Sequence, residues 1–507
     1  MLRLRRFPID TYNEAVAYLP RRSAIYRPEE FQALAKVEIV GQGRRIVAVV
    51  NVIDHPDLLA PDQIALSEQG FAKLGLPEGS EVELIHAPPP ESLEAVRRKI
   101  NGEVLSSEEL SAIVADIANF NYSKMDIAAF LVASASSMSP SETLYLTRAM
   151  AAVGTQLKWP DGLVVDKHCI GGIPGNRTSM VVVPIVAAHG LAIPKTSSRA
   201  ITSPAGTADT MEVLARVNLE IGEIRELIRA EKGCLVWGGH VNLSPADDIL
   251  ISVERPLRID TPEQMVASIL SKNAAAGSSC LVIDIPIGPS AKVRHHDGAV
   301  RLRKLFEFVG EHLGMNINVV LSDGSQPVGR GIGPVLEARD VLKVLHREPD
   351  APADLRERAL QLAGQVLEFD PALYGGHGYA RARELLDSGA ALAKMERIRK
   401  LQGPPPASAS LGKLQHEVAA EQDGIVTTID CYAIARIARL AGAPNDKGAG
   451  IDLLKKVGDR VERGEPLYRI HAGLPIDFKF AVERAQQDSA FTLNAIQQSS
   501  RPSVAAV

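Results

Sequence analysis

The sequence is poor in cysteine and has no cysteine pair with the spacing of a metal or redox motif. Its four cysteines stand far apart and include no C-x-x-C: Cys169, Cys234, Cys280 and Cys431. The spacing therefore offers neither a disulfide framework nor a C-x-x-C zinc or redox site. We expect four reduced thiols, as in proteins of the cytosol.

The sequence also lacks long apolar runs and an excess of positive charge. No apolar run reaches the about 20 residues that a membrane span needs. The basic N-terminus, residues 1–16, lacks the apolar segment of a secretory signal. A formal net charge of −5 argues against a nucleic-acid binder, which normally shows a basic face. We therefore expect a cytoplasmic protein with no membrane and no nucleic-acid partner.

What remains is the composition of an ordinary globular protein on a long chain. Of the 507 residues, 46% are hydrophobic and 23% are charged, which are typical values for soluble domains. A chain of this length can bury two or more hydrophobic cores. Length and composition are therefore consistent with a soluble enzyme of more than one domain.

The stretch 166–207 concentrates the polar chemistry of the chain. An apolar run at 162–165 predicts a short buried strand, and residues 166–168 place charge at its end. A tight turn follows at 171–176, built on glycines that enter positive φ freely. An apolar helix is expected after it, at 180–191.

The order strand, glycine turn and helix presents backbone N–H groups at a helix N-terminus, where the dipole favours an anion. A second polar loop at 195–207 adds two cations and several hydroxyls, which a phosphate with several acceptor oxygens needs. Most glycine turns are nevertheless only turns, and neither the Walker A spacing nor G-x-G-x-x-G is present. Chemistry alone leaves an oxyanion site and a structural turn both open.

The exact sequence of residues 166–207 is more specific than the types of residue that it contains. K-H-x-x-G-G from Lys167, S-x-R from Ser197 and G-T at 206–207 resemble the signature of the thymidine and pyrimidine-nucleoside phosphorylase family. The longer string D-K-H-C-I-G-G-I-P-G-N-R-T resembles the branch that contains archaeal AMP phosphorylases and bacterial type 2 thymidine phosphorylases. The resemblance runs from about residue 91 to the C-terminus. It implies a pentosyltransferase that cleaves the N-glycosidic bond of a nucleoside with inorganic phosphate.

The resemblance implies a fold of the class α/β plus all-α. A helical domain and an α/β phosphate-binding domain with a large mixed sheet are expected to form a cleft, with residues 91–160 and 244–278 in the first domain and 161–243 and 279–402 in the second. Residue patterns favour the same division. Ser106-x-x-Glu109 is a capping box at a helix start, and the apolar run 279–287 predicts a strand covered on both faces.

Two further modules are expected at the ends of the chain. Residues 1–86 alternate in polarity around Gly41-Gln42-Gly43, which predicts a β-rich module with a hairpin. Residues 408–507 resemble the half-barrel repeats of biotinyl carrier domains, so an α+β half-barrel domain is expected. They lack the M-K-M of a carrier, so the scaffold and not the carrier function is implied. A glycine loop at 329–333 favours a close-packing turn over ligand contact.

Phosphorolysis requires a phosphate to be held against the cationic C1′ of the sugar. By resemblance, the phosphate-binding residues are Lys167, Gly172, Ser179, Ser197 and Thr207. The family usually has serine two residues after the lysine, where this chain has Cys169. We therefore expect a backbone N–H group to replace that hydroxyl.

The departing base must also be stabilised or protonated. By resemblance, the residues near the base or sugar are His168, Arg255, Ser268 and Lys272, and in the nucleotide-type branch Asp260 matches a proton donor and Lys292 a further substrate contact. Asp260, His168 and Arg255 are therefore the expected catalytic residues. To donate at neutral pH, Asp260 needs a pKa raised by burial. By composition alone, the reading of Asp260 as a surface acid before a helix and of Lys272 as a solvated helix lysine is favoured.

The loop after Ser197 departs from the thymidine enzymes. Their S-G-R-G-x-G-H-T-G-G-T is replaced by a string with more hydroxyls, in which we expect the substrate-binding residues Ser198, Arg199, Ala200, Ile201, Thr202 and Ser203. Their tyrosine three residues before the arginine is Ser252 here. These changes leave the base and the 5′ substituent of the substrate open.

Thymidine phosphorylase activity is the first expectation, with AMP phosphorylase activity as the alternative. An anthranilate-type phosphoribosyltransferase would use a diphosphate sugar and Mg²⁺, but its G-T-G-G-D and K-H-G-N motifs are missing. A non-catalytic nucleotide sensor is a further class. We expect no metal and no organic cofactor, inorganic phosphate as co-substrate, and a homodimer or larger homo-oligomer.

Overall fold

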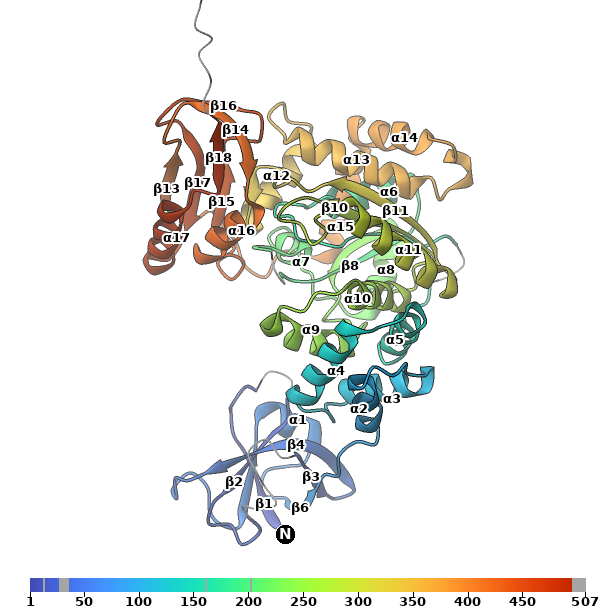
Figure 1. Cartoon of the computed structure of the whole chain (residues 1–507), viewed down its shortest axis with the longest axis vertical. Coiled ribbons are helices and arrows are strands. Elements are labelled where there is room, and N and C mark those ends of the chain that lie inside the picture. Colours follow the sequence, from blue (N-terminus) through green and yellow to red (C-terminus); the bar gives the residue numbers. More distant parts are fainter. Residues whose placement is uncertain (12–13, 27–35, 160–161, 201–202, 495–507) are drawn as a thin grey trace, which may run out of the picture. The chain divides into compact units, whose positions relative to one another are not determined.

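The computed structural model describes residues 1–494 apart from 12–13, 27–35, 160–161 and 201–202 (Figure 1). The chain forms two compact units. The first consists of residues 1–149 and 246–261, and the second of residues 150–245 and 262–507.

The first unit begins with a closed β-barrel. Its strands follow the order β1-β5-β2-β4-β3-β6 around the barrel, with the bounds β1 Leu2–Arg6, β2 Val16–Pro20, β3 Lys36–Gly41, β4 Arg44–Ile53, β5 Gln63–Leu66 and β6 Glu81–His86. Side chains such as Leu4 and Ile39 fill the interior, and α1 (Glu68–Leu74) packs against β4. The predicted hairpin is confirmed, because β3 and β4 pair antiparallel up to Gly41 and Arg44.

Helices make up the rest of the first unit, at α2 Leu93–Ile100, α3 Ser107–Ala118, α4 Lys124–Ser136, α5 Pro140–Ala152 and α9 Pro245–Leu257, where α5 ends and α9 begins in the second unit. The predicted capping box is confirmed: Ser106 Oγ accepts from the Glu109 N–H, and the Glu109 carboxylate accepts from the Ser106 N–H. Lys36 joins the barrel to these helices, since its ammonium donates to the carbonyl oxygens of Phe120 and Tyr122.

A fully buried ion pair crosslinks the helices. Lys99 Nζ of α2 lies 2.6 Å from Glu142 Oε1 of α5, and each side chain is 1% exposed. Glu142 also accepts from the N–H groups of Leu105 and Ser139. The carboxylate therefore holds together α2, the connection to α3 and the start of α5.

The second unit is built on parallel strands: β7 Val165–Cys169, β8 Ile193–Ser197, β9 Gly233–Trp237, β10 Cys280–Ile287 and β11 Asn316–Asp323. They pair in the orders β11-β10-β7 and β8-β9, parallel throughout. A parallel bridge between Val164 and Ala192 joins β7 to β8. The large mixed sheet that we predicted is therefore wrong for the described strands of this domain, because crossover helices return each strand in the same direction.

The strand predicted at 162–165 is displaced along the chain. β7 runs from Val165 to Cys169, so Asp166 and Lys167 lie inside it and are buried. Both charges have partners: Lys195 Nζ lies 3.0 Å from Asp166 Oδ2, and Lys167 Nζ donates to Thr178 Oγ1 at 2.7 Å. Buried charges are tolerated only when they have partners. The position of this strand therefore depends on contacts with distant residues and cannot be predicted from the polarity of the strand itself.

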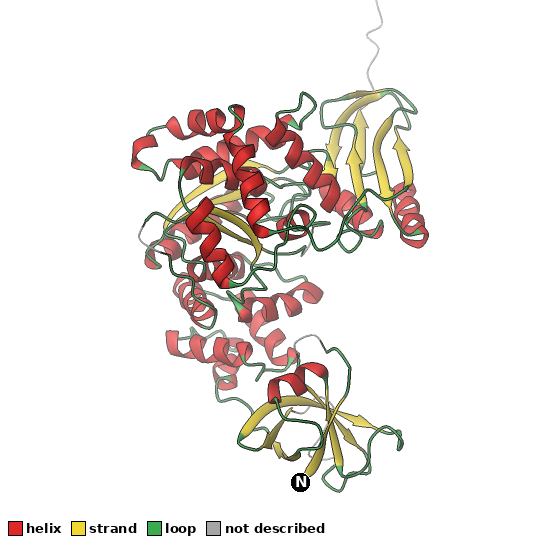
Figure 2. Ribbon diagram, turned by 180° about the vertical axis from the view of Figure 1, so that it is seen from behind, coloured by secondary structure: helices red, strands yellow, loops and turns green. Residues whose placement is uncertain are grey.

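Helices pack around these strands (Figure 2), with the bounds α6 Ser179–His189, α7 Thr207–Met211, α8 Ile221–Glu231, α10 Pro262–Ala275, α11 His296–His312, α12 Pro334–His346, α13 Ala353–Leu367, α14 His377–Asp387 and α15 Ala390–Gln402, and a 3₁₀ turn at Pro371–Leu373. β10 is buried from Cys280 to Pro286, which confirms the predicted strand covered on both faces. α6 is buried from Ser179 to Ala187 and continues through Pro184. No helix in the described part of the chain is long and apolar enough to cross a membrane.

The C-terminal part forms two small sheets with their own hydrophobic core, which includes Val426, Ile451 and Tyr468. The sheets have the orders β12-β15-β17-β13 and β16-β14-β18, with β12 Gly331–Ile332, β13 Leu414–Ala419, β14 Gly424–Ile429, β15 Gly450–Leu453, β16 Arg460–Val461, β17 Pro466–Ala472 and β18 Phe491–Asn494. Two helices complete it, α16 Cys431–Leu440 and α17 Pro475–Gln487. The glycine loop 329–333 contributes β12 to the first sheet, so it has a packing role.

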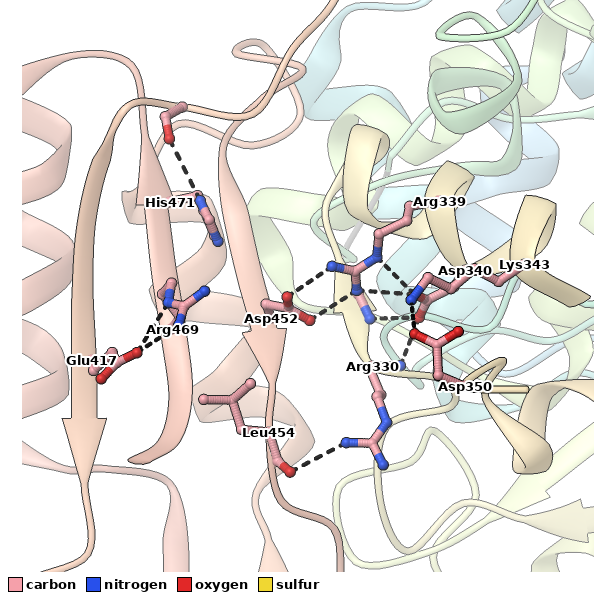
Figure 3. Close-up of polar contacts among 12 residues, drawn as sticks. Arg330, Arg339, Asp340, Lys343, Asp350, Glu417, Asp452, Leu454, Arg469 and His471 are labelled. Carbon is pink, nitrogen blue, oxygen red and sulfur yellow. Dashed lines mark hydrogen bonds and ion pairs between the residues drawn. The ribbon is translucent and has the colours of Figure 1, made fainter. Parts of the chain in front are cut away.

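Arg339 of α12 fastens this C-terminal part to the rest of the second unit (Figure 3). Its guanidinium donates to both carboxylate oxygens of Asp452 in β15, at 2.7 and 2.8 Å. The neighbouring Asp340 accepts from the N–H groups of Arg330 and Gly331, at 2.7 and 2.6 Å. A bidentate pair and a capped loop therefore fix the contact between α12 and β15.

The ion pair in the helices of the first unit allows a direct test of stability. We expect Lys99→Met to lower the free energy of unfolding of this unit by about 3–5 kcal/mol, because it leaves the buried Glu142 carboxylate without its counter-charge. Urea denaturation followed by circular dichroism measures the change. Arg97→Met on the same helix is the control, since Arg97 and Glu94 form an exposed pair worth about 0–1 kcal/mol. Equal effects of the two substitutions would contradict the assignment.

Candidate anion and substrate site

The residues predicted to bind phosphate gather at the carboxyl ends of β7 and β8. The two strands run parallel through the Val164–Ala192 bridge, so their carboxyl ends lie at the same edge, where α/β proteins bind ligands. Each predicted ligand lies on an element that ends or begins there: Lys167 in β7, Gly172 in the turn after it, Ser179 first in α6, Ser197 last in β8 and Thr207 first in α7. The structure therefore brings all five into one region of the second unit.

A positive φ and a close contact fix the glycine turn. Gly172 has a φ of +95°, and a Cβ there would lie 3.0 Å from the backbone nitrogen of Lys292. Any other residue would be strained and crowded. The same close approach brings Lys292, a predicted substrate contact, beside the turn.

Lys167 lies behind the turn and not on its surface. Its Nζ donates to Thr178 Oγ1 at 2.7 Å, and that hydroxyl donates to Asn176 Oδ1 at 3.0 Å. Burial lowers the pKa of Lys167, while the nearby Asp284 carboxylate acts to raise it. The side chain therefore places positive charge next to the residue that precedes α6.

A buried guanidinium ties the two loops of the site together. Arg177 Nε forms an ion pair with Glu337 of α12. Its other nitrogens donate to Thr207 Oγ1 and to the Ala205 carbonyl oxygen, both at 2.8 Å. Because Thr207 Oγ1 accepts from Arg177, its own hydrogen is free to point to a ligand. Sequence reasoning gave Arg177 no role. Its place directly after a glycine turn is the signal that could have found it.

The Ser197 hydroxyl is a buried polar group whose hydrogen-bonding capacity is not used by the described residues. It is buried and has no hydrogen-bond partner among the described residues, although most buried hydroxyls have one. Ser197 ends β8, so its side chain lies at the edge where the glycine turn and α6 begin. An acceptor oxygen of a bound anion would satisfy this hydroxyl.

His168 is neutral at pH 7. Burial moves its pKa well below the ordinary value, and four lysine ammonium groups act in the same direction: Lys195, Lys272, Lys167 and Lys292. One ring nitrogen of a neutral imidazole donates a hydrogen bond and the other accepts one. His168 is therefore suited to hydrogen bonding with an uncharged or partly charged group.

Ser268 and Lys272 share a face of α10, as their spacing predicts. Lys272 Nζ donates to Ser268 Oγ at 3.1 Å. Both side chains are partly buried, and Lys272 is among the cations that lower the pKa of His168. The structure therefore places this pair and His168 within electrostatic range of each other, in the second unit.

The loop after Ser197 is held by two acids that sequence reasoning missed. Arg199 donates to Asp209 Oδ1 at 3.1 Å and to both carboxylate oxygens of Glu212, at 2.8 and 2.7 Å. Asp209 Oδ2 accepts from the N–H groups of Ala200 and Gly206, at 2.7 and 2.9 Å. Asp209 is the third residue of α7, after Gly206 at the N-cap. An acid at this position is a capping signal, and it could have revealed the role of Asp209.

The other predicted residues of this loop line the same segment. The Ser198 carbonyl oxygen accepts an N–H group at the start of α7, and Ser203 Oγ donates to the Ala205 carbonyl oxygen at 2.6 Å. Ile201 and Thr202, also predicted to bind substrate, lie outside the described residues.

Arg255 and Asp260 belong to the first unit, in α9 and after it. Both are exposed in this structure. Asp260 is therefore not buried as we expected of a proton donor, because it follows the end of α9 at the surface. The proposed roles of the two residues remain predictions.

Cys169 holds the glycine turn. Its Sγ accepts from the Gly171 N–H at 3.4 Å and from Asn176 Nδ2 at 3.3 Å. Burial, and secondarily the Asp284 carboxylate, raises the pKa of this thiol to about 12. The thiol is therefore protonated at neutral pH and shapes the turn in which the family usually has a serine.

Three buried cations lie in this region: Lys167, and Arg177 and Lys195, which pair with Glu337 and Asp166. In the ranges that the structure describes, no three histidine, cysteine, aspartate or glutamate side chains form a group that could hold a metal ion. The arrangement can bind an anion and position an uncharged ring beside it.

Three protein-family models match the chain. Residues 93–154 match the glycosyl transferase family helical bundle domain, residues 161–392 the glycosyl transferase family a/b domain, and residues 425–492 the pyrimidine nucleoside phosphorylase C-terminal domain. The two glycosyl transferase matches cover the helices α2 to α5 and the parallel strands that carry the anion site.

Curated relatives are similar over nearly the whole chain. A protein of Rhodopseudomonas palustris named "Putative thymidine phosphorylase" is 59% identical over 493 residues, which is 97% of this chain and 96% of that protein. Proteins with the same name are 60% identical in Bradyrhizobium diazoefficiens, covering 93% of this chain and 92% of theirs, and 56% identical in Methylococcus capsulatus, covering 97% and 96%.

Solved structures share the central fold. Anthranilate phosphoribosyltransferase from Thermus thermophilus superposes with a TM-score of 0.51 at 23% identity, covering 61% of this chain and 99% of that one. At this identity the likeness shows the fold alone: a helical bundle with an α/β domain.

The four thiols give a test of the buried surroundings of Cys169. Burial raises the pKa of all four, to about 12 for Cys169 and Cys431. At pH 8 a thiol with that pKa is about 10⁻⁴ ionised, and only the thiolate reacts. We expect the native protein to react with Ellman's reagent at least about 100-fold more slowly than a free thiol, whose pKa is about 8.5, and four thiols to react after denaturation. Rapid reaction of one thiol that Cys169→Ser abolishes would contradict the assignment.

Proposed function

Because the chain belongs to the thymidine and pyrimidine-nucleoside phosphorylase family, we propose that it is a pentosyltransferase with thymidine phosphorylase activity. It converts thymidine and inorganic phosphate into thymine and 2-deoxy-α-D-ribose 1-phosphate. One observation carries the proposal: the Ser197 hydroxyl, buried and without a partner among the described residues, lies at the carboxyl end of β8, in a region where Arg177 ties the second loop to the first.

The phosphate occupies the space between the two loops. The N-terminus of α6 offers backbone N–H groups and the positive end of the helix dipole. Ser179, Ser197 and Thr207 supply hydroxyl donors, and Lys167 supplies charge behind them. A phosphate oxygen held in this way attacks C1′ while the glycosidic bond breaks, and its negative charge stabilises the cationic sugar carbon.

The base is held by donors and cations on the other side of the sugar. Lys272 and Ser268 stabilise the negative charge that develops on departing thymine, and neutral His168 hydrogen-bonds to the base or sugar. By the family resemblance, Arg255 contacts the base, and Asp260 protonates a leaving base that needs it.

AMP phosphorylase activity, giving a free base and ribose 1,5-bisphosphate, is the second candidate. The hydroxyl-rich loop with Ser198 and Ser203 favours it, because these groups suit a 5′-phosphate. An anthranilate-type phosphoribosyltransferase shares the fold but lacks support from the motifs of this sequence.

A substrate panel tests the proposal. Thymidine, uridine, adenosine and the 5′-monophosphates are each incubated with the enzyme, with and without inorganic phosphate, and base release is followed by chromatography. We expect phosphate-dependent release of thymine without added Mg²⁺ and in the presence of EDTA. Base release from AMP and from no other substrate favours the second candidate. Release that depends on diphosphate and Mg²⁺ favours the transferase. No release under any condition favours a sensor. Gel filtration tests the expected homodimer or larger oligomer.

Removal of phosphate donors has a defined kinetic signature. We expect Lys167→Ala and Thr207→Ala each to raise the KM for phosphate about 10- to 100-fold, because the first removes positive charge behind the hydroxyl donors and the second removes a hydrogen bond to a charged group. Steady-state kinetics at saturating nucleoside measures it. Thr427→Ala in the C-terminal sheet, where the hydroxyl bonds only to the Thr492 carbonyl oxygen among the described contacts, is the control. Unchanged phosphate dependence in both variants would overturn the assignment of the anion site.

The role of Asp260 depends on the leaving group. An amide keeps the shape of the carboxyl but cannot protonate a base, so Asp260→Asn should lower kcat about 10²–10⁴-fold for a basic leaving group such as adenine. The loss should be smaller for thymine, which leaves as an anion held by cations. Rates on bases of graded acidity test this, with Asp297→Asn, an exposed acid of α11, as control. Equal small losses across the series would remove Asp260 from the mechanism.

A further inference from the structure

A cluster of four charged side chains links the C-terminal part of the chain to the second anion loop, which we define as residues 198–200 and 203–206. Lys447 Nζ lies 3.4 Å from Asp209 Oδ1 and 3.0 Å from Glu212 Oε2. Arg199 of the loop binds the same two carboxylates. Two cations from distant parts of the chain thus share two acids.

The acids of this cluster set the shape of the loop. The Asp209 side chain is 4% exposed, and its Oδ2 binds the N–H groups of Ala200 and Gly206, one on each side of the loop. Thr207, whose hydroxyl is a proposed phosphate donor, directly follows Gly206. A change in the position of Asp209 therefore moves Thr207.

Lys447 is held rigidly enough to act on the loop. Its carbonyl oxygen accepts from the Val335 N–H in α12, at 3.1 Å. The preceding Asp446 accepts from the N–H groups of Gly448 and Gly473, both at 2.9 Å. The backbone on both sides of Lys447 is thus anchored before its side chain reaches the acids.

The charge balance gives the cluster its effect on an anion. With Lys447 present, two carboxylates face two cations. Arg199, and after it Lys447, holds the pKa of Glu212 at about 2, so this acid is charged throughout the neutral range. Without Lys447, a partly buried net negative charge remains beside a site that must bind phosphate, and partly buried charges are screened little by salt.

We propose that Lys447 is a positioning residue through which the C-terminal part of the chain sets the affinity of the phosphate site. It touches neither substrate, and it acts by neutralising Asp209 and Glu212 and by fixing the loop that ends at Thr207. The inference rests on the proposed function, because it concerns the phosphate of that reaction.

The alternative is that Lys447 only fastens the C-terminal part to the second unit. Arg339 provides a matched control, because its pair with Asp452 fastens the same part of the chain through α12 (Figure 3) and makes no contact with the anion loop among the described residues. Its side chain is about as exposed as that of Lys447, at 30% against 26%. Arg339→Met therefore loosens the attachment without altering the charge beside the loop.

Lys447→Met, Lys447→Arg and Arg339→Met in the full chain test the proposal. Thermal unfolding, phosphate binding by calorimetry, and kcat and KM for both substrates are measured. We expect Lys447→Met to weaken phosphate binding and raise the KM for phosphate about five- to tenfold with kcat within about twofold, the pattern of lost binding. Lys447→Arg should restore the KM, and Arg339→Met should lower the unfolding temperature and leave the KM unchanged.

Tryptophan emission gives a second readout that does not depend on activity. The Arg199 guanidinium lies 4.7 Å from the centre of the Trp237 ring, and Trp159→Phe removes the only other tryptophan. In that background we expect Lys447→Met, and not Arg339→Met, to shift the emission of Trp237.

The outcomes separate this inference from the proposed function. Wild-type protein that binds no phosphate overturns both. Wild-type protein that binds phosphate, together with Lys447→Met that binds it equally well, overturns the role of Lys447 alone. A rise in the phosphate KM of the same size in Arg339→Met also overturns it, since it would show an effect of attachment and not of charge.

Discussion

The buried ion pair between Arg177 and Glu337 is the interaction on which the geometry of the site depends. It joins the end of the glycine turn to α12, and the same guanidinium holds Thr207 and the Ala205 carbonyl oxygen. Glu337 also binds the Thr210 hydroxyl and the Gly333 N–H. The cations of two loops that approach one anion repel each other, and both loops contact the same anion oxygens. A third element is therefore needed to fix the separation of the loops. α12 is that element, and the C-terminal sheets are attached to it as well.

The local features of the fold follow from the sequence because local chemistry determines them. A glycine turn between a strand and a helix, a capping box at Ser106 and an apolar strand at 279–287 each depend on residues within one turn or one strand. The start of β7 does not. Asp166 and Lys167 lie inside that strand because Lys195 and Thr178 meet them from elsewhere in the chain, and polarity along the strand carries no sign of those partners.

The same limit explains what sequence reasoning missed. Arg177 and Glu337 are 160 residues apart, and Lys447 and Asp209 are 238 apart. In the sequence each is an ordinary charged residue, and only the fold shows which residues it pairs with. The parallel pairing of the strands likewise follows from how the crossover helices return the chain, and not from the pattern of any one strand. Asp260 is the opposite case. Its role is predicted from family resemblance, and its exposed surroundings in the fold do not support that role.

The N-terminal barrel has a consequence for how such proteins are assembled over evolution. In a closed barrel every strand has two neighbours, so no open sheet edge is left when the module is joined to another domain or removed from it. A gene fusion could therefore add residues 1–86 in one step without creating an aggregation-prone surface. Part of the attachment does not depend on side chains of the helices, because Lys36 donates to the backbone carbonyl oxygens of Phe120 and Tyr122. A module of this kind can be gained or lost between lineages while the catalytic core stays intact.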